Sequence, residues 1–306
     1  MNTRYSGYFY CTLAMIGVGT TVIVSKTIAA GLPPFTATAL RFAIAFPVFV
    51  AMMRVQKTGW PKLDKRDALL VIAQAGAGSV GYTVCLISGM RLASAADAGV
   101  IAGTLPAVSA GFAALALGER PSLALLGAIA LATVGVLACT VRIDDMAASR
   151  DAHSLVGNML IGAAIVCEAL FILLNRKLRT PVAALPLSAL MSGIGLLVAI
   201  VPAAFEQPWR IPFDASLVAA LTGVVYYALV PTVLGFVLWY AGASRISGAE
   251  AGLVTALVPV STLAFAAGLL HESISHAQLA GVACVLAAVL LATLGQLRSA
   301  RVSAKA

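Results

Sequence analysis

The sequence predicts an all-α membrane protein with ten transmembrane helices, arranged as two inverted five-helix repeats. Three observations lead there: the composition, the lengths of the apolar segments, and an internal repeat. The chain has 306 residues, of which 61% are hydrophobic and 10% are charged. A soluble domain carries about 25% charged and 45–50% apolar residues. A lipid bilayer is therefore the solvent that suits this composition.

The apolar segments are long enough to cross a membrane, because about 20 helical residues span the hydrocarbon core. The connections are short and rich in turn residues, except for two longer charged loops near residues 54–66 and 142–154. This pattern leaves no room for a soluble domain. The predicted spans are 7–29, 34–53, 67–89, 94–117, 122–141, 155–178, 182–203, 215–240, 247–270 and 277–297.

The positive charges predict how the chain is oriented. The formal net charge is +8, and the basic residues cluster in short loops, which favours membrane orientation over nucleic-acid binding as their role. If the N-terminus is inside, the outer side holds five basic residues: Lys26, Arg91, Arg142, Arg150 and Arg210. The inner side then holds 14: Arg4, Arg54, Lys57, Lys62, Lys65, Arg66, Arg120, Arg176, Lys177, Arg179, Arg245, Arg298, Arg301 and Lys305. We therefore expect a multi-pass protein of the bacterial inner membrane with both termini in the cytoplasm.

Two stretches of the chain match at an offset of 153 residues. Asp97 corresponds to Glu250, Pro106 to Pro259, and residues 118–119 to residues 271–272. A looser match near 150 relates residues 25–26 to residues 175–176. The repeat predicts a first unit at 1–148 and a second at 149–306. Each unit holds five spans, so the second must enter the membrane upside down, as in many secondary transporters.

Small residues recur every four positions in the fourth and ninth spans. Such ridges let helices pack closely in lipid, and the two ridges could also meet where the halves slide. Pro106 and Pro259 lie near the middle of these spans and should kink them, beside a central cavity or simply for packing. The ridge residues are Ala95, Gly99, Gly103, Ala107 and Gly111, then Gly248, Gly252, Ala256, Val260, Ala264 and Gly268.

Two stretches of the first half form recognisable motifs. One runs from Ser25-Lys26 through residues 31–34 to Leu40-Arg41-Phe42, and the other from Pro106 to Gly118-Glu119-Arg120. Together they resemble motifs of the EamA-type drug/metabolite transporters. The likeness covers nearly the whole chain, although His271-Glu272-Ser273 replaces Gly-Glu-Arg in the second half. The resemblance implies an inner-membrane secondary carrier that exports small metabolites by alternating access. Amino acids are frequent cargoes in the family, as in the YddG-like exporters.

Glu168 is the sharpest candidate for a substrate-binding residue. It lies near the centre of the sixth span, where a charge costs roughly 2.5–3.5 kcal/mol on insertion scales. The carboxylate could neutralise a substrate ammonium or carry a coupling proton, and a structural partner is the alternative. The other predicted substrate-binding residues are polar or aromatic and lie at similar depth: Thr21, Gln74, Ser79, Tyr82, Tyr226, Tyr227 and Thr255. Gln74, Gly78 and Tyr82 are expected on one helix face, whereas Thr21 and Thr255 could instead bond to helix carbonyls.

Arg41 lies about seven residues into the second span, where it could extend toward the outer surface or pair with Asp97. Asp97 and Glu250 begin the fourth and ninth spans, so they could cap those helices or act as gates. Arg41, Asp97, Glu250 and the two prolines form the predicted gating set. For Lys26, near the outer end of the first span, both substrate exit and anchoring remain open.

Other functional classes lack their motifs. The chain has no His-Glu-x-x-His helix and no phosphate-binding loop, and its three histidines lie at loops or helix ends. Its five cysteines fall in apolar segments without metal-ligand spacing. We therefore expect that the protein is not an enzyme and uses no cofactor or metal. Its expected partners are a small-molecule substrate and the lipid bilayer, but no nucleic acid. Whether protons are coupled to transport stays open. A passive channel and a nucleotide-sugar carrier of the same superfamily remain as alternatives.

Overall fold

The computed structural model describes residues 3–117, 123–140, 152–180, 182–246, 254–255 and 257–303. Every regular element in these ranges is a helix, which confirms the all-α prediction. Among these residues, 6 helical segments are long and apolar enough to cross a membrane, and shorter apolar helices accompany them. The count of ten spans and their inverted arrangement stay predictions.

The helices follow the predicted spans closely. In the first half they are α1 (Thr3–Gly31), α2 (Pro34–Val55), α3 (Lys65–Gln74), the π-helical segment η1 (Ala75–Gly81), α4 (Tyr82–Met90), α5 (Ala95–Ala102), α6 (Leu105–Leu117) and α7 (Leu123–Thr140). In the second half they are α8 (Ala152–Arg176), α9 (Ala184–Phe205), the short η3 (Pro208–Arg210), α10 (Ala215–Tyr227), the π-helical segment η4 (Ala228–Leu234), α11 (Gly235–Ala243), α13 (Leu257–Leu269) and α14 (His276–Ser303).

Backbone details recur at the offsets found in the sequence. Helices α2 and α9 both have 22 residues and begin at residues 34 and 184, which are 150 positions apart. Each is followed two residues later by a left-handed residue, Lys57 or Gln207, at φ 51. The π-helical segments each have 7 residues and begin at residues 75 and 228, which are 153 positions apart. These correspondences support the repeat that the sequence predicts.

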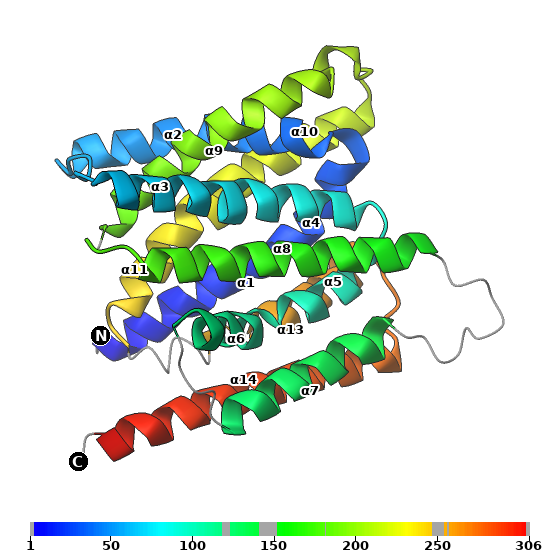
Figure 1. Ribbon diagram of the computed structural model, residues 1–306. Helices are drawn as coiled ribbons and strands as arrows, with labels where there is room; N and C mark the ends of the chain where they lie inside the picture. Colours follow the sequence, from blue (N-terminus) through cyan, green and yellow to red (C-terminus); the bar gives the residue numbers. More distant parts are fainter. Residues whose placement is uncertain are drawn as a thin grey trace.

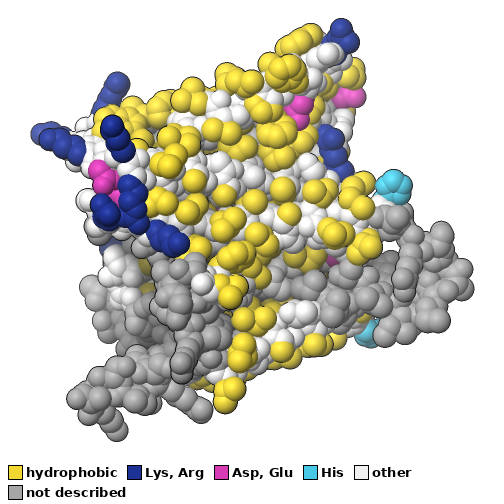
Figure 2. All heavy atoms as spheres, viewed as in Figure 1, with side chains coloured by type: hydrophobic (Ala, Val, Ile, Leu, Met, Phe, Trp, Pro, Cys, Tyr) yellow, Lys and Arg dark blue, Asp and Glu magenta, His cyan; other side chains and the backbone are white. Residues whose placement is uncertain are grey.

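The helices run roughly side by side in one bundle (Figure 1). Helices α2 and α9 pack together along one edge, and α7 and α14 pack together along the opposite edge. Helix α1 begins and α14 ends at the same end of the bundle, here called the terminal end; the opposite end is called the hairpin end. On the face in Figure 2, Lys and Arg side chains gather mainly at the terminal end, and hydrophobic side chains cover the middle.

Large apolar side chains point outward, while several polar ones are buried. Leu115 is 85% exposed, Leu197 70% and Val201 60%, whereas Gln74 and Thr262 are fully buried. A soluble protein would not expose so much contiguous apolar surface. The bundle is therefore that of a membrane protein.

Glycines of the ridge in the fourth span pack closely against the ninth span. A Cβ added to Gly99 would lie 2.7 Å from Thr262 Cγ2, and one added to Gly103 would lie 3.0 Å from Pro259 Cγ. The described residues of the ridge in the ninth span, Val260, Ala264 and Gly268, are all exposed, so the predicted meeting of the two ridges is not seen there. Gly248, Gly252 and Ala256 lie outside the described residues. Close packing between α5 and α13 therefore depends on the glycines of the first half.

The two prolines lie in the first turns of helices rather than inside continuous ones. Helix α5 ends at Ala102 and α6 begins at Leu105, so Pro106 follows a break in the fourth span. Pro259 is the third residue of α13. The first turn tolerates proline because its N–H groups have no partner within the helix. The predicted interruption beside Pro106 is thus a break in the helix rather than a kink.

Candidate functional site

Arg41 occupies the centre of a polar cluster between the two halves. It comes from α2, and its Nε donates a hydrogen bond to Thr232 Oγ1 (2.9 Å) while its Nη1 donates to Thr83 Oγ1 (2.7 Å). Each threonine hydroxyl donates its own proton to a backbone carbonyl, of Tyr227 and Ser79 respectively, both at 2.8 Å. Each hydroxyl oxygen is thereby left to accept from the guanidinium.

The π-helical segments position these hydroxyls. Thr232 lies within η4, and Ser79, whose carbonyl holds Thr83, lies within η1. Such wide turns are rare and occur frequently at functional sites, because they shift side chains and carbonyls away from the regular helical positions. Both halves therefore present an irregular backbone to Arg41.

Aromatic rings and unpaired hydroxyls surround the guanidinium. Arg41 Cζ lies 4.2 Å from the centroid of the Tyr227 ring and 5.0 Å from that of Phe42, distances at which a cation is attracted to a ring face. The hydroxyls of Tyr227 and Ser25 are buried and lie near each other, and neither makes a hydrogen bond of normal geometry within the part of the chain that the structure describes. An unsatisfied buried hydroxyl is costly, so these two groups are available to a ligand or to water.

Glu168 faces the same cluster from the other half. It lies on α8, is partly buried, and interacts electrostatically with Arg41 and Tyr82. No ion pair joins Glu168 to Arg41 among the residues that the structure describes. The cluster therefore brings an acidic and a basic side chain near each other without a direct ion pair.

The remaining predicted substrate-binding residues have other contacts. Gln74 is buried and donates from Nε2 to the carbonyl of Phe171 on α8 (3.2 Å). The hydroxyl of Tyr226 donates to Thr20 on α1 (3.0 Å), and that of Thr21 donates to the carbonyl of Val18 (2.7 Å). Thr255 lies in a turn before α13. The structure thus gathers Thr21, Arg41, Ser79, Tyr82, Tyr227 and Glu168, since Thr21 also lies beside Tyr82 and Tyr227. It gives Gln74 and Tyr226 contacts between helices.

Arg41 adopts neither of the two arrangements expected from the sequence. It bonds to Thr83 and Thr232 instead of Asp97, and it lies within the bundle. Asp97 lies in the first turn of α5, as expected, where its carboxylate accepts from Gln278 Nε2 on α14 (2.8 Å). Glu250, the repeat partner of Asp97, lies outside the described residues.

At the hairpin end, Glu272 links the two halves. Its carboxylate forms an ion pair with Lys26 on α1 and accepts from the backbone N–H groups of Ala95 (3.3 Å) and Ala96 (3.2 Å). An acid there also complements the positive end of the α5 dipole. Lys26, whose role the sequence left open, is thus engaged in holding this end together.

Three residues that position the site or the start of α2 were not predicted from the sequence. Thr83 and Thr232 hold Arg41, and each stands next to a residue of evident interest, Tyr82 or the mid-span Pro231. Glu206 accepts from the N–H groups of Phe35 (3.0 Å) and Thr36 (2.7 Å) at the start of α2. The signal for Glu206 was weak, because an acid after a predicted span is common in any loop.

A helical bundle with an apolar surface, and with charged side chains gathered between its halves, is the architecture of a membrane transporter. The chain belongs to the EamA-like transporter family, whose model matches residues 5–141 and 155–294. The two matched segments cover most of the chain.

Curated relatives are transporters by name. The chain is 32% identical over 290 residues to the uncharacterized transporter YetK of Bacillus subtilis, covering 94% of this chain and 86% of the relative. It is 28% identical over 313 residues to a probable amino-acid metabolite efflux pump of Salmonella typhimurium, covering 96% and 98%. It is also 28% identical over 240 residues to a probable terminal-alkyne amino-acid exporter of Streptantibioticus cattleyicolor, covering 77% of each. A solved crystal structure matches with a TM-score of 0.62 at 21% identity, over 96% of this chain and 99% of the other, which shows the shared fold.

Proposed function

We propose that the protein is an alternating-access secondary transporter of the bacterial inner membrane that exports amino acids or related zwitterionic metabolites. The observation that carries this proposal is the placement of Arg41 and Glu168. They have opposite charge, come from different halves, and lack a mutual ion pair within the part of the chain that the structure describes. A ligand with one carboxylate and one ammonium group satisfies both. The names of two relatives support the same class of cargo.

The proposal gives a role to each side chain. The guanidinium of Arg41 has donors beyond those used by Thr83 and Thr232, and these suit a carboxylate. Glu168 would hold the ammonium group, and the rings of Tyr82 and Tyr227 would pack against the rest of the cargo. A carboxylate on the transport path also offers a place for a coupling proton.

Alternating access would then separate the two repeats, residues 1–148 and 149–306, at one end at a time. The hairpin end is joined by Glu272 in the conformation described. The terminal end carries most of the basic loop residues, which supports a cytoplasmic location for that end and for both termini.

Reconstitution into proteoliposomes tests the proposal. Proteoliposomes that contain the purified protein would be assayed with a panel of labelled amino acids, with and without a pH gradient. We expect saturable counterflow of at least one neutral amino acid. Flux of a sugar nucleotide with no flux of any amino acid would overturn the proposal. Flux without saturation or counterflow would identify a channel instead.

Replacing Glu168 separates the role of the carboxylate from that of the fold. Glu168→Gln keeps the size of the side chain but loses the charge that holds the ammonium, so we expect counterflow to fall by about tenfold or more. Asp214→Asn is the matched control, because Asp214 is exposed and caps α10 at the hairpin end. Full activity of Glu168→Gln with an unchanged pH dependence would reject a role in binding or coupling.

A further inference from the structure

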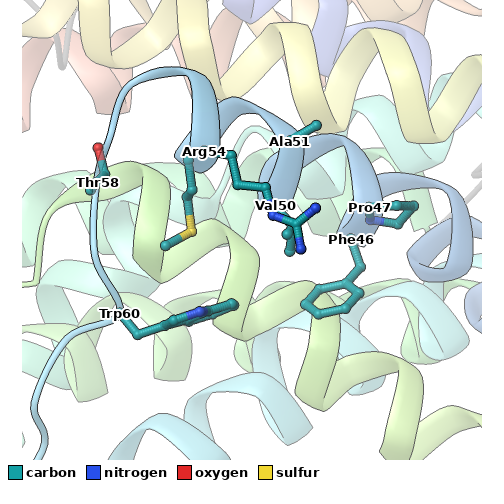
Figure 3. A pocket seen from close by; sticks show the side chains of 8 residues that line it. Phe46, Pro47, Val50, Ala51, Arg54, Thr58 and Trp60 are labelled. Atoms are coloured by element: carbon teal, nitrogen blue, oxygen red, sulfur yellow. The ribbon is translucent and has the colours of Figure 1, made fainter.

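A pocket of about 470 Å³ opens beside the last turns of α2, at the terminal end and away from the Arg41 cluster (Figure 3). The proposed transport path uses none of its residues. Apolar and aromatic side chains form most of its wall, and one cation lies among them. Its lining residues are Phe46, Pro47, Val50, Ala51, Met53, Arg54, Thr58 and Trp60.

The chain builds this pocket by turning back on itself. Helix α2 ends at Val55, and Lys57 takes up a left-handed conformation at φ 51. The turn is closed by hydrogen bonds from Lys57 N to Arg54 O (3.2 Å) and from Thr58 N to Met53 O (2.9 Å). This reversal brings Thr58 and Trp60 opposite the outward face of α2, and Figure 3 shows Arg54, Phe46 and Trp60 around one opening.

The pocket faces the surroundings of the bundle rather than its interior. The buried face of α2 carries Phe42 and Phe49, at 2% and 1% exposure, and Met53, at 3% exposure, forms the inner wall of the pocket. Pro47, Ala51 and Arg54 lie on the opposite face and are exposed, and Trp60 is 52% exposed. In a membrane protein this outward surface meets lipid, and tryptophan at such a position is typical of the boundary between headgroups and acyl chains.

The charge of the pocket is positive. Arg54 has no acidic partner among the residues that the structure describes. The loop that follows α2 adds Lys57 and Lys62, both exposed, and helix α3 begins with Lys65 and Arg66. The nearby acids are engaged elsewhere: Asp64 with Arg179 (3.8 Å), and the buried Asp67 with backbone N–H groups of Arg179 and Thr180. Basic clusters next to a transmembrane helix attract anionic lipids.

We infer that this pocket binds an anionic phospholipid from the leaflet at the terminal end of the bundle. Arg54 holds the phosphate, and the apolar face made by Phe46, Val50 and Trp60 receives the first part of an acyl chain. The volume suits a headgroup with its nearest carbons and leaves the rest of the lipid in the bilayer. This site does not depend on the cargo or on the direction of transport.

Quenching of Trp60 fluorescence tests the site. The double variant Trp209→Phe and Trp239→Phe leaves Trp60 as the sole tryptophan, because the chain has three. It would be placed in phosphatidylcholine vesicles containing increasing fractions of brominated phosphatidylglycerol or brominated phosphatidylcholine. We expect stronger quenching by the anionic lipid at equal mole fraction. Adding Arg54→Gln should lower the preference for the anionic lipid by about fivefold.

Lys62→Gln is the matched control, since Lys62 is an exposed cation of the same loop that does not line the pocket. It should leave most of the preference intact. Equal quenching by the two lipids would overturn the proposal. An equal loss in Arg54→Gln and Lys62→Gln would also overturn it, because it would reveal a diffuse attraction to the whole loop.

Native mass spectrometry gives a second readout that does not require the tryptophan substitutions. The wild-type protein should retain phosphatidylglycerol over phosphatidylcholine after transfer from detergent, Lys62→Gln should do the same, and Arg54→Gln should lose the bound lipid. Retention of the lipid by Arg54→Gln to the wild-type extent would contradict the site. Both measurements are made without cargo, so their failure is distinguishable from failure of the proposed transport function.

Discussion

Helices α2 and α9 have the same length and the same closing turn, yet they carry different chemistry. At equal positions 150 residues apart, α2 has Arg41 where α9 has Met191, and the residue after each helix is Gln56 or Glu206. Arg41 organises the central cluster, whereas Met191 is buried in an apolar contact. Glu206 caps the start of α2, whereas Gln56 is exposed. The backbone is repeated, but the polar contacts that serve binding and stability are not.

The π-helical segments show the same contrast in a different way. Gly78 in η1 and Pro231 in η4 occupy equal positions, 153 residues apart. Phe171 of α8 packs where a side chain at position 78 would lie, since an added Cβ would be 2.3 Å from Phe171 Cβ. Pro231 has no N–H and therefore cannot make the regular helical hydrogen bond. The same backbone deformation is thus accompanied by different local packing in the two halves.

The largest effect should come from giving α2 the residue of its partner helix. Arg41→Met removes the hydrogen bonds to Thr83 and Thr232 and the group that would hold the cargo carboxylate. We expect counterflow of the best amino-acid substrate to fall by about 10- to 100-fold. Arg41→Lys should be intermediate, because a compact ammonium cannot reproduce the planar guanidinium contacts. Met191→Leu is the control and should transport normally. Wild-type activity of Arg41→Met would show that the difference between the helices has no bearing on transport.

A steric test addresses the first π-helical segment. Gly78→Ala would force a methyl group into Phe171 and should destabilise the protein by about 1–3 kcal/mol. Gly76→Ala, in the same segment, is the matched control, since an added Cβ there meets nothing within 4 Å. The measurement is thermal stability in detergent by size-exclusion chromatography after heating. If the two variants have the same melting temperature, close packing of α8 against Gly78 does not contribute to the stability of η1.

The smallest effect should come from making the two closing turns alike. Glu206→Gln keeps one acceptor oxygen for the N–H groups of Phe35 and Thr36 but loses the charge. We expect a cost of about 1 kcal/mol, or a fall of about 2–4 °C in melting temperature. Gln56→Glu at the opposite end should change stability by less, because Gln56 is exposed. A larger fall in melting temperature for Gln56→Glu than for Glu206→Gln would contradict the stabilising role assigned to Glu206.

Much of the helix pattern followed from the sequence, because segment length and hydropathy are local properties. The central contacts did not. Gln74, Gly78 and Tyr82 were expected on one face, and the first two do contact Phe171 on α8. Tyr82 instead lies near Thr21, Arg41 and Glu168. The π-helical segment between them breaks the regular spacing of four, and single-sequence periodicity assumes a regular helix.

The partners of Arg41 were unpredictable for a related reason. Its two hydroxyl acceptors come from positions 42 and 191 residues away in the chain, on helices of both halves. Residue type marked Arg41 and Glu168 as unusual within apolar segments, but only the packing of the helices brings them to one place. The substrate role of these side chains stays a prediction until transport is measured.

The bridging position of Glu272 has a consequence for how the hairpin end would open. A single carboxylate holds both the ammonium of Lys26 and the first N–H groups of α5. Moving it away from one partner also removes it from the other, so the two contacts should break together rather than in sequence. Opening would then be cooperative, with few half-open states. Because the contact with Lys26 is an ion pair and the Lys26 side chain is 37% exposed, high ionic strength should weaken it and favour the open form.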